Sequence, residues 1–276
     1  MPRVLQRSLQ RLFAKILCAL YAENDRGASS ADADSSSVGV GAMRTGERTN
    51  PGRIGVLAAV CTVALAAAGL SGCSYLNDHH AESDATITQQ VHALRIDNPA
   101  GQVVIHAGDP AGGIVVRRDI DYHSDQPPTP GQAVTSGVLE LTANCGDCGI
   151  AYDVTVPPPL AVTVVDNAGE VTVAGVAGAV DVTASAGHVE GRDLRSPSVR
   201  VQASAGAVNL TFAAPPDDVT AHSNAGEVTV AVPDGTYAVD ASTNAGARTV
   251  SVPTDPAAAH HVKVSSNAGA VTVSTA

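Results

Sequence analysis

The sequence predicts an all-β protein built as a parallel β-solenoid, or β-helix, with repeats of about 18–23 residues. Three observations lead to this prediction. The chain of 276 residues has no Trp and only two Phe, so Val and Ala supply most of its apolar surface. Short stretches alternate apolar and polar residues, which is the period of a half-buried β-strand. A small-residue turn that ends in Ala-Gly recurs along the chain, which is typical of a repeat protein.

The repeated turn carries a glycine at the same point of each unit. The spacings between successive turn glycines from Gly169 onward are 18, 19, 20, 20 and 23 residues. An earlier copy at 98–101 is separated from the others by an insertion. The glycines concerned are Gly101, Gly169, Gly187, Gly206, Gly226, Gly246 and Gly269. Glycine allows a positive φ in the turn, and the Asn or Ser two places before it can bond within the turn. One unit cannot bury its Val face alone, so the units are expected to stack in register.

The first 42 residues look like a helix followed by a linker. Arg3, Arg7, Arg11 and Lys15 recur every four positions, as on one stripe of a basic amphipathic helix. Residues 27–42 are rich in Ser, Ala, Asp and Gly and suit a flexible linker. We consider two explanations for residues 1–42. Either translation begins further downstream, at Met43, or the segment is a genuine cytosolic extension.

An uncharged apolar run covers residues 54–72 and follows three arginines. A basic start, an apolar centre and small residues at the end describe a secretory signal. The ending Leu70-Ser71-Gly72-Cys73 resembles the lipobox of bacterial lipoproteins. The resemblance implies that residues 43–72 are a helical lipoprotein signal peptide and that Cys73 is lipidated and begins the mature protein. The alternative is an uncleaved transmembrane helix, since the run is just long enough to span a bilayer.

Charge divides at the same cysteine. Ahead of Cys73 there are eight Lys or Arg against five Asp or Glu, whereas from Cys73 onward there are eight against twenty-two. The mature chain therefore carries a net charge of −14, which should repel nucleic acid and anionic lipid. We expect contact with the membrane through the lipid anchor and no nucleic-acid partner.

The mature chain divides into a tether and a β-domain. Residues 73–90 are polar and short of large apolar side chains, so we expect a tether there. The β-domain is expected over residues 91–276, and its N-terminal part is less regular than the repeats. Alternation predicts strands near 113–123, 138–142 and 152–156 in that part.

The repeated Asn/Ser-Ala-Gly-x-Val-x-Val pattern and the strand Tyr-Asp-Val-Thr-Val-Pro at 152–157 resemble an adhesin-like family of bacterial domains of unknown function. The resemblance covers about residues 94–276. It implies an extracytoplasmic β-solenoid and says little about activity. One repeat departs from the pattern, because Arg248 stands where the other copies have Val. We expect a local shift, a bulge or an edge position there.

Few residues suggest chemistry. Cys145 and Cys148 are expected to form a disulfide in an oxidising compartment, with a redox pair or a metal site as alternatives. We expect no catalytic residue, cofactor or metal site. The histidines at 79–80 and 260–261 fall in the tether and in a loop. Arg117, Asp119, Asp121 and His123 share one strand face, which is either a carboxylate cluster for acid–base or cation chemistry or an ordinary solvated face.

The final repeat, around Gly269, ends close to the C-terminus. We expect this C-terminal coil to close the stack and to expose an unpaired edge that docks on a partner or on a second copy. The alternative is that residues 274–276 and the loop with the paired histidines cover the edge.

The function expected from the sequence is that of a cell-envelope lipoprotein. Its solenoid would present a non-catalytic binding or adhesion surface to an envelope protein or glycan. Two other functions stay open. One is a sensory or regulatory envelope protein, and the other is a polysaccharide-acting β-helix enzyme, which the scarcity of aromatic residues disfavours.

Overall fold

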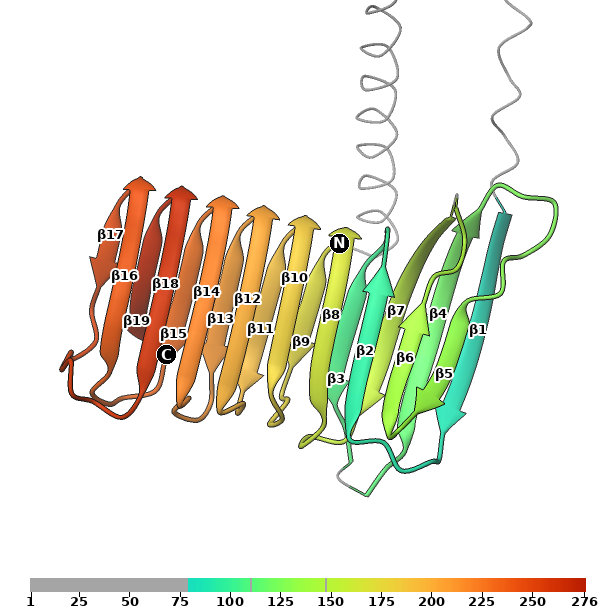
Figure 1. Ribbon diagram of the computed structural model, residues 1–276, viewed down its shortest axis with the longest axis horizontal. Coiled ribbons are helices and arrows are strands. Elements are labelled where there is room, and N and C mark those ends of the chain that lie inside the picture. Colours follow the sequence, from blue (N-terminus) through green and yellow to red (C-terminus); the bar gives the residue numbers. More distant parts are fainter. Residues whose placement is uncertain (1–78, 110, 147) are drawn as a thin grey trace, which may run out of the picture. The chain divides into compact units, whose positions relative to one another are not determined.

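The computed structural model describes residues 79–109, 111–146 and 148–276, and this part of the chain is all-β (Figure 1). Its strands form one sheet of ten strands and one of nine, and no helix occurs among the described residues. The predicted fold class, a parallel β-solenoid, is confirmed. The expected amphipathic helix, linker and helical signal peptide, together with Cys73, lie outside the described residues.

The ten-stranded sheet is named sheet A. Its strands, in spatial order, are β1 (His79–Ile87), β4 (Ile114–Tyr122), β7 (Cys148–Val156), β3 (Val103–Ala107), β9 (Val171–Ala174), β11 (Val189–Leu194), β13 (Val208–Phe212), β15 (Val228–Val232), β19 (Val271–Thr275) and β17 (Arg248–Val250). The nine-stranded sheet is named sheet B. Its strands, from the other end, are β16 (Ala238–Ala245), β18 (His261–Ala268), β14 (Asp218–Ala225), β12 (Ser198–Ala205), β10 (Val180–Ala186), β8 (Ala161–Ala168), β2 (Ala93–Asn98), β6 (Val138–Thr142) and β5 (Gly131–Thr135).

Each coil of the solenoid gives one strand to each sheet. The chain runs along sheet B, turns at Ala-Gly, and continues along sheet A, as from β8 to β9. Neighbouring coils pair in parallel and in register, so that Val180 lies opposite both Val162 and Val199. Because side chains alternate between the two faces of a strand, these valines all point inward and are buried. Burying one Val side chain contributes about 1.5–3 kcal/mol, and stacking makes that burial possible for every coil.

The turn glycines touch one another through the backbone. A Cβ atom on Gly206 would lie 1.7 Å from the carbonyl oxygen of Gly187, and the φ of Gly206 is +136°. Gly187 has the same relationship to Gly169. At Gly169 the φ lies outside the left-handed region, yet a Cβ would still lie only 2.0 Å from the carbonyl oxygen of Gly101. The close approach of successive coils therefore excludes a side chain even where the backbone conformation would tolerate one.

The N-terminal part departs from the solenoid. Strand β4 pairs in antiparallel fashion with β1 and β7, and β5 pairs in the same way with β6. The tether expected over residues 73–90 is wrong from His79 onward, because His79–Ile87 forms β1, and the domain therefore begins before residue 91. The strand was overlooked because its inner side chains, such as Ala81 and Ala85, are small and give a weak apolar signal.

The last coil along the chain is not the last coil of the stack. Strands β18 and β19 are inserted between the coil β14/β15 and the coil β16/β17, and they pair in parallel with both neighbours. The expectation that the C-terminal coil ends the stack is therefore wrong, and its Val271 and Val273 are fully buried. Of the alternatives for Arg248, the edge position is the one observed, because β17 is the outermost strand of sheet A. An inward position between two coils would place its charge in the valine core.

Candidate functional site

A cluster of titratable side chains lies on the outer face of sheet A, where β1 pairs with β4. His80 lies directly opposite Asp121, and Glu82 lies opposite Asp119. Alternate residues of a strand point to the same face, so these four side chains stand on the solvent side, while Ile120 between the two aspartates is buried. The regular ladder between two paired strands thus fixes the spacing of the group.

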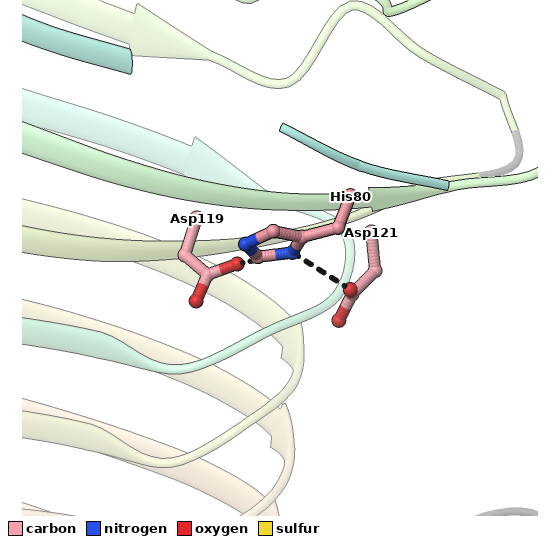
Figure 2. A group of neighbouring side chains, drawn as sticks. All are labelled: His80, Asp119 and Asp121. Atoms are coloured by element: carbon pink, nitrogen blue, oxygen red, sulfur yellow. Dashed lines mark hydrogen bonds and ion pairs between the residues drawn. The ribbon is translucent and has the colours of Figure 1, made fainter. Parts of the chain in front are cut away.

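Figure 2 shows the imidazole of His80 between two carboxylates. Its Nδ1 atom lies 3.0 Å from Asp119 Oδ1 and 3.3 Å from Asp121 Oδ1. The Nε2 atom lies 3.7 Å from Oε1 of Glu82. The hydrogen bond to Asp121 raises the pKa of His80 above its ordinary value. Desolvation opposes this shift, and the charges of both aspartates add to it. The side chains of His80, Asp119 and Asp121 are 45%, 41% and 65% exposed, so the cluster is open to solvent.

The structure brings together residues that lie about forty positions apart in the sequence. Arg117, Asp119 and Asp121 share the outer face of β4 as expected, and His123 lies just beyond the end of that strand. His80 joins them only because the expected tether is strand β1. The alternation of Ala and Ile with His, Glu, Asp and Thr along residues 80–87 is the signal that could have revealed this strand.

A second histidine–carboxylate pair lies on the same sheet. His106 of β3 and Asp153 of β7 approach to 2.8 Å between Nε2 and Oδ1, and both side chains are about half exposed. This pair has one carboxylate, whereas His80 lies near three, those of Asp119, Asp121 and Glu82. Of the other histidines considered from the sequence, His260 bonds to the carbonyl oxygen of Pro216, with 2.7 Å between Nδ1 and the oxygen. The contacts of His106 and His260 are ordinary interactions of partly exposed side chains.

A polar pair is buried where the solenoid repeats begin. Asn98 and Asp166 are both fully buried, and Asn98 Nδ2 donates to Asp166 Oδ1 at 3.2 Å and to the Gly101 carbonyl oxygen at 3.0 Å. Burial raises the pKa of Asp166 to about 6, although the hydrogen bond from Asn98 opposes the shift. In a later coil the equivalent residue is Ser223, whose hydroxyl donates to the carbonyl oxygen of Gly206. The same position is Ala184 and Ala203 in the two coils between them, so a hydrogen-bonding side chain occurs there in some coils and not in others.

The exposed Asn and Ser residues of the turns form a ladder along one edge of the solenoid. Asn267 Nδ2 donates to Asn224 Oδ1 at 2.9 Å, and Asn244 Nδ2 donates to Asn267 Oδ1 at 3.1 Å. In earlier coils the hydroxyl of Ser185 donates to Asn167 Oδ1 at 3.4 Å. The turns thus present a column of amide and hydroxyl groups, which we name the turn ladder. It comprises Asn167, Ser185, Ser204, Asn224, Asn267 and Asn244.

The outermost coil borders an open groove of about 450 Å³. Val239, Val250 and Val252 supply its apolar lining, and Asp240 and Arg248 supply charge. The groove lies at the end of the core, where no further coil stacks on β16 and β17.

Two cysteines of the described domain lie close together ahead of the main part of β7. The Cα atoms of Cys145 and Cys148 are 5.8 Å apart, and disulfides span about 4.4–6.8 Å between Cα atoms. The separation is compatible with the expected disulfide, which stays a prediction.

Among the described residues, no helix has the length and apolar character required to cross a membrane.

The fold defines a class of protein, the two-sheet parallel β-solenoid in which a glycine turn joins the two strands of each coil. Within that class, the family model named Toastrack DUF4097 matches residues 88–274, and the chain belongs to this family. The family expected from the repeat pattern is thereby confirmed.

Several solved structures of adhesin candidates are similar to this chain. One is a candidate cell adhesion protein of Clostridium sporogenes, 12% identical, with 72% of this chain and all of that chain covered and a TM-score of 0.43. Another is a candidate adhesin of Bacteroides fragilis, 14% identical, with 72% and 97% covered and a TM-score of 0.35. A third, from Parabacteroides merdae, is 11% identical, with 70% and 95% covered and a TM-score of 0.31. Among curated proteins, none matches the chain.

Proposed function

We propose that this chain is a lipid-anchored protein of the bacterial cell envelope, on the extracytoplasmic face of the cytoplasmic membrane. Its solenoid would be a non-catalytic surface for binding or adhesion. The observation that carries the proposal is the in-register stack, which repeats the same exposed positions from coil to coil. Solenoids of this kind use such extended surfaces to bind other molecules.

The turn ladder is the part of that surface best suited to a partner. All of its side chains except Ser204 are hydrogen-bonded to another member of the ladder, as Asn224 is to Asn267, so little conformational entropy is lost when a partner binds them. Amides and hydroxyls can both donate and accept hydrogen bonds, which suits a glycan or the backbone of an envelope protein. The strongly acidic mature chain makes nucleic acid and anionic lipid poor partners.

Site-specific photo-crosslinking in intact cells tests the binding surface. A photoreactive residue at Ser204 lies on the turn ladder, and one at Thr211 lies on the outer face of β13 as a matched exposed control. We expect a discrete cross-linked product from Ser204 and none from Thr211. Products from neither position, or from both positions alike, would contradict the ladder as the binding surface.

The anchor is tested separately. Replacement of the lipobox cysteine, Cys73→Ala, should abolish labelling with a radioactive fatty acid and leave an unprocessed precursor. Labelling that persists in this variant would disprove the lipid anchor, whatever the result at the turn ladder.

A further inference from the structure

We propose that His80, Asp119 and Asp121 bind one divalent transition-metal ion of the zinc type. The proposal is independent of the function proposed above, because it concerns a different face of the domain. It rests on the chemistry of the three side chains, on the distances between their ligand atoms and on the strand pairing that holds them.

The combination of donors selects the kind of ion. Carboxylates alone suit Ca²⁺ and Mg²⁺, whereas an imidazole among the ligands favours Zn²⁺ and its neighbours in the first transition series. Here the Nδ1 atom of His80 faces both Asp119 and Asp121. Three protein ligands with a free position for water is a common arrangement at zinc.

The distances suit one shared ion. Zinc bonds to nitrogen and oxygen are about 2.0–2.2 Å long, so ligand atoms around a tetrahedral ion lie about 3.4 Å apart. The two observed separations from Nδ1 of His80 are 3.0 and 3.3 Å, and the three ligand atoms all lie within 4.8 Å of one another. These side chains are partly exposed, which leaves room for the small rotations that bring the carboxylates of Asp119 and Asp121 closer together.

The backbone supports the same arrangement. His80 and Asp121 are directly opposed residues of an antiparallel pair, and Asp119 lies diagonally from His80 within reach of its side chain. Glu82 lies opposite Asp119 and is the nearest candidate for a fourth ligand. Strand β1 lies at the edge of sheet A opposite to β17 and pairs only with β4. A bound ion would therefore fasten the edge strand to the sheet.

The pair formed by His106 and Asp153 provides a matched control within the same sheet. Its side chains make a close histidine–aspartate contact and are exposed to a similar extent, but no second carboxylate joins them. Among the described residues, the cluster around His80 is the only group of three metal-ligating side chains whose ligand atoms all lie within 4.8 Å of one another. Loss of His106 should therefore leave metal binding unchanged.

The test uses the full chain, purified in detergent without a polyhistidine tag. Calorimetric titration with Zn²⁺ is compared between the wild type and the His80→Asn, Asp119→Asn and His106→Asn variants. We expect the first two substitutions to weaken binding at least about tenfold, since even the loss of a second-shell partner costs about 10–100-fold. The His106→Asn variant should bind as the wild type does.

Two further measurements separate a metal site from a simple ion pair. Co²⁺ should give visible absorption bands in the wild type that disappear in His80→Asn. Saturating Zn²⁺ should raise the thermal midpoint of the wild type and not that of His80→Asn, because only a ligand that binds the folded state stabilises it. Equal Zn²⁺ binding by wild type and His80→Asn, or no binding by either, would overturn the proposal. If His80→Asn fails to fold, Asp121→Asn takes its place in each comparison.

Discussion

Arg248 donates a hydrogen bond from Nε to the carbonyl oxygen of Ala241, at 2.8 Å. The contact joins the outermost strand of sheet A, β17, to the outermost strand of sheet B, β16. In register, Arg248 occupies the position at which the neighbouring coil has the buried Val271. The side chain therefore spans the end of the valine core and places a charged, hydrated group where another coil would otherwise stack.

We predict that Arg248 decides which of the last two coils is outermost. With Arg248→Val the coil β16/β17 would have the same residue at this position as β18/β19, which has Val271 there, so the two coils could exchange places. The expected results are partial exchange and end-to-end association of the solenoid, because the cap is lost. Light scattering at increasing protein concentration measures the association.

Engineered cysteine pairs report the coil order directly. Thr220 lies opposite Lys263 in the observed order, so cysteines at these two positions should cross-link. In the observed order β18 lies between Thr220 and Asp240, because each of these residues is paired with Lys263 from one side. Cysteines at Thr220 and Asp240 should therefore cross-link only after the two coils exchange places. The observed order should dominate in the wild type and in Arg192→Ala, a control that removes an exposed arginine from its surface ion pair. An unchanged cross-linking pattern in Arg248→Val, with no association, would show that Arg248 does not set the order.

The repeats could be predicted from the sequence because each one has the same pattern of residues. The glycine of every turn and the valines on either side of it carry the signal, and the structure places them one above another. The stacking order could not be predicted, because β16/β17 and β18/β19 both fit next to β14/β15 by pattern alone. Arg248 is the one charged residue at an inner position of these two coils. A single such residue signals an irregularity without showing where in the stack its coil lies.

The cluster around His80 was hidden for a different reason. A strand is recognised by the apolar residues on its inner face, and Ala81 and Ala85 bury little surface there. Asp119 and Asp121 were found as neighbours on one strand face, since their spacing of two residues is local. Their proximity to His80 depends on an antiparallel pairing between segments about forty residues apart, which no local pattern reveals.

The stacked turns predict a sharp difference between two glycines. Gly206→Ala should destabilise the domain by about 3 kcal/mol or more, because the new Cβ would overlap the Gly187 carbonyl oxygen and the φ of +136° disfavours any side chain. Gly146→Ala should be nearly neutral, because no atom lies within 4 Å of the position that its Cβ would occupy. The midpoints of urea unfolding measure both effects. Similar midpoints for the two variants would contradict the close contact between coils.

The cysteine pair gives a prediction about the oxidised domain. Cys145 and Cys148 should resist alkylation in protein isolated from the envelope and should become reactive after reduction. The closed loop is short, so the loop-entropy argument limits the stabilisation to about 2 kcal/mol. Mass spectrometry of alkylated protein distinguishes the states, and two freely alkylated thiols without reduction would disprove the disulfide.

The buried carboxyl of Asp166 predicts that stability falls as the pH rises. Its pKa in the folded state is about 6, whereas the ordinary value is 3.8, so the folded state holds its proton more tightly than the unfolded state does. The stabilisation that comes from this proton is fully present below about pH 4. It is lost as the pH rises to about 6 and is absent at higher pH. By linkage the loss is about 3 kcal/mol at most.

Variants of Asp166 test this dependence. Asp166→Asn removes the titration, and Asp166→Ser introduces the residue found at Ser223 and Ser266, whose hydroxyls donate to turn carbonyl oxygens. In both variants the free energy of unfolding, measured by urea titration between pH 4 and pH 7, should fall less steeply than in the wild type. Asp181→Asn, at an exposed position of the next coil, is the control and should keep the wild-type slope. If Asp166→Asn keeps that slope too, a different group causes the dependence, and Asp166 is ionised in the folded protein.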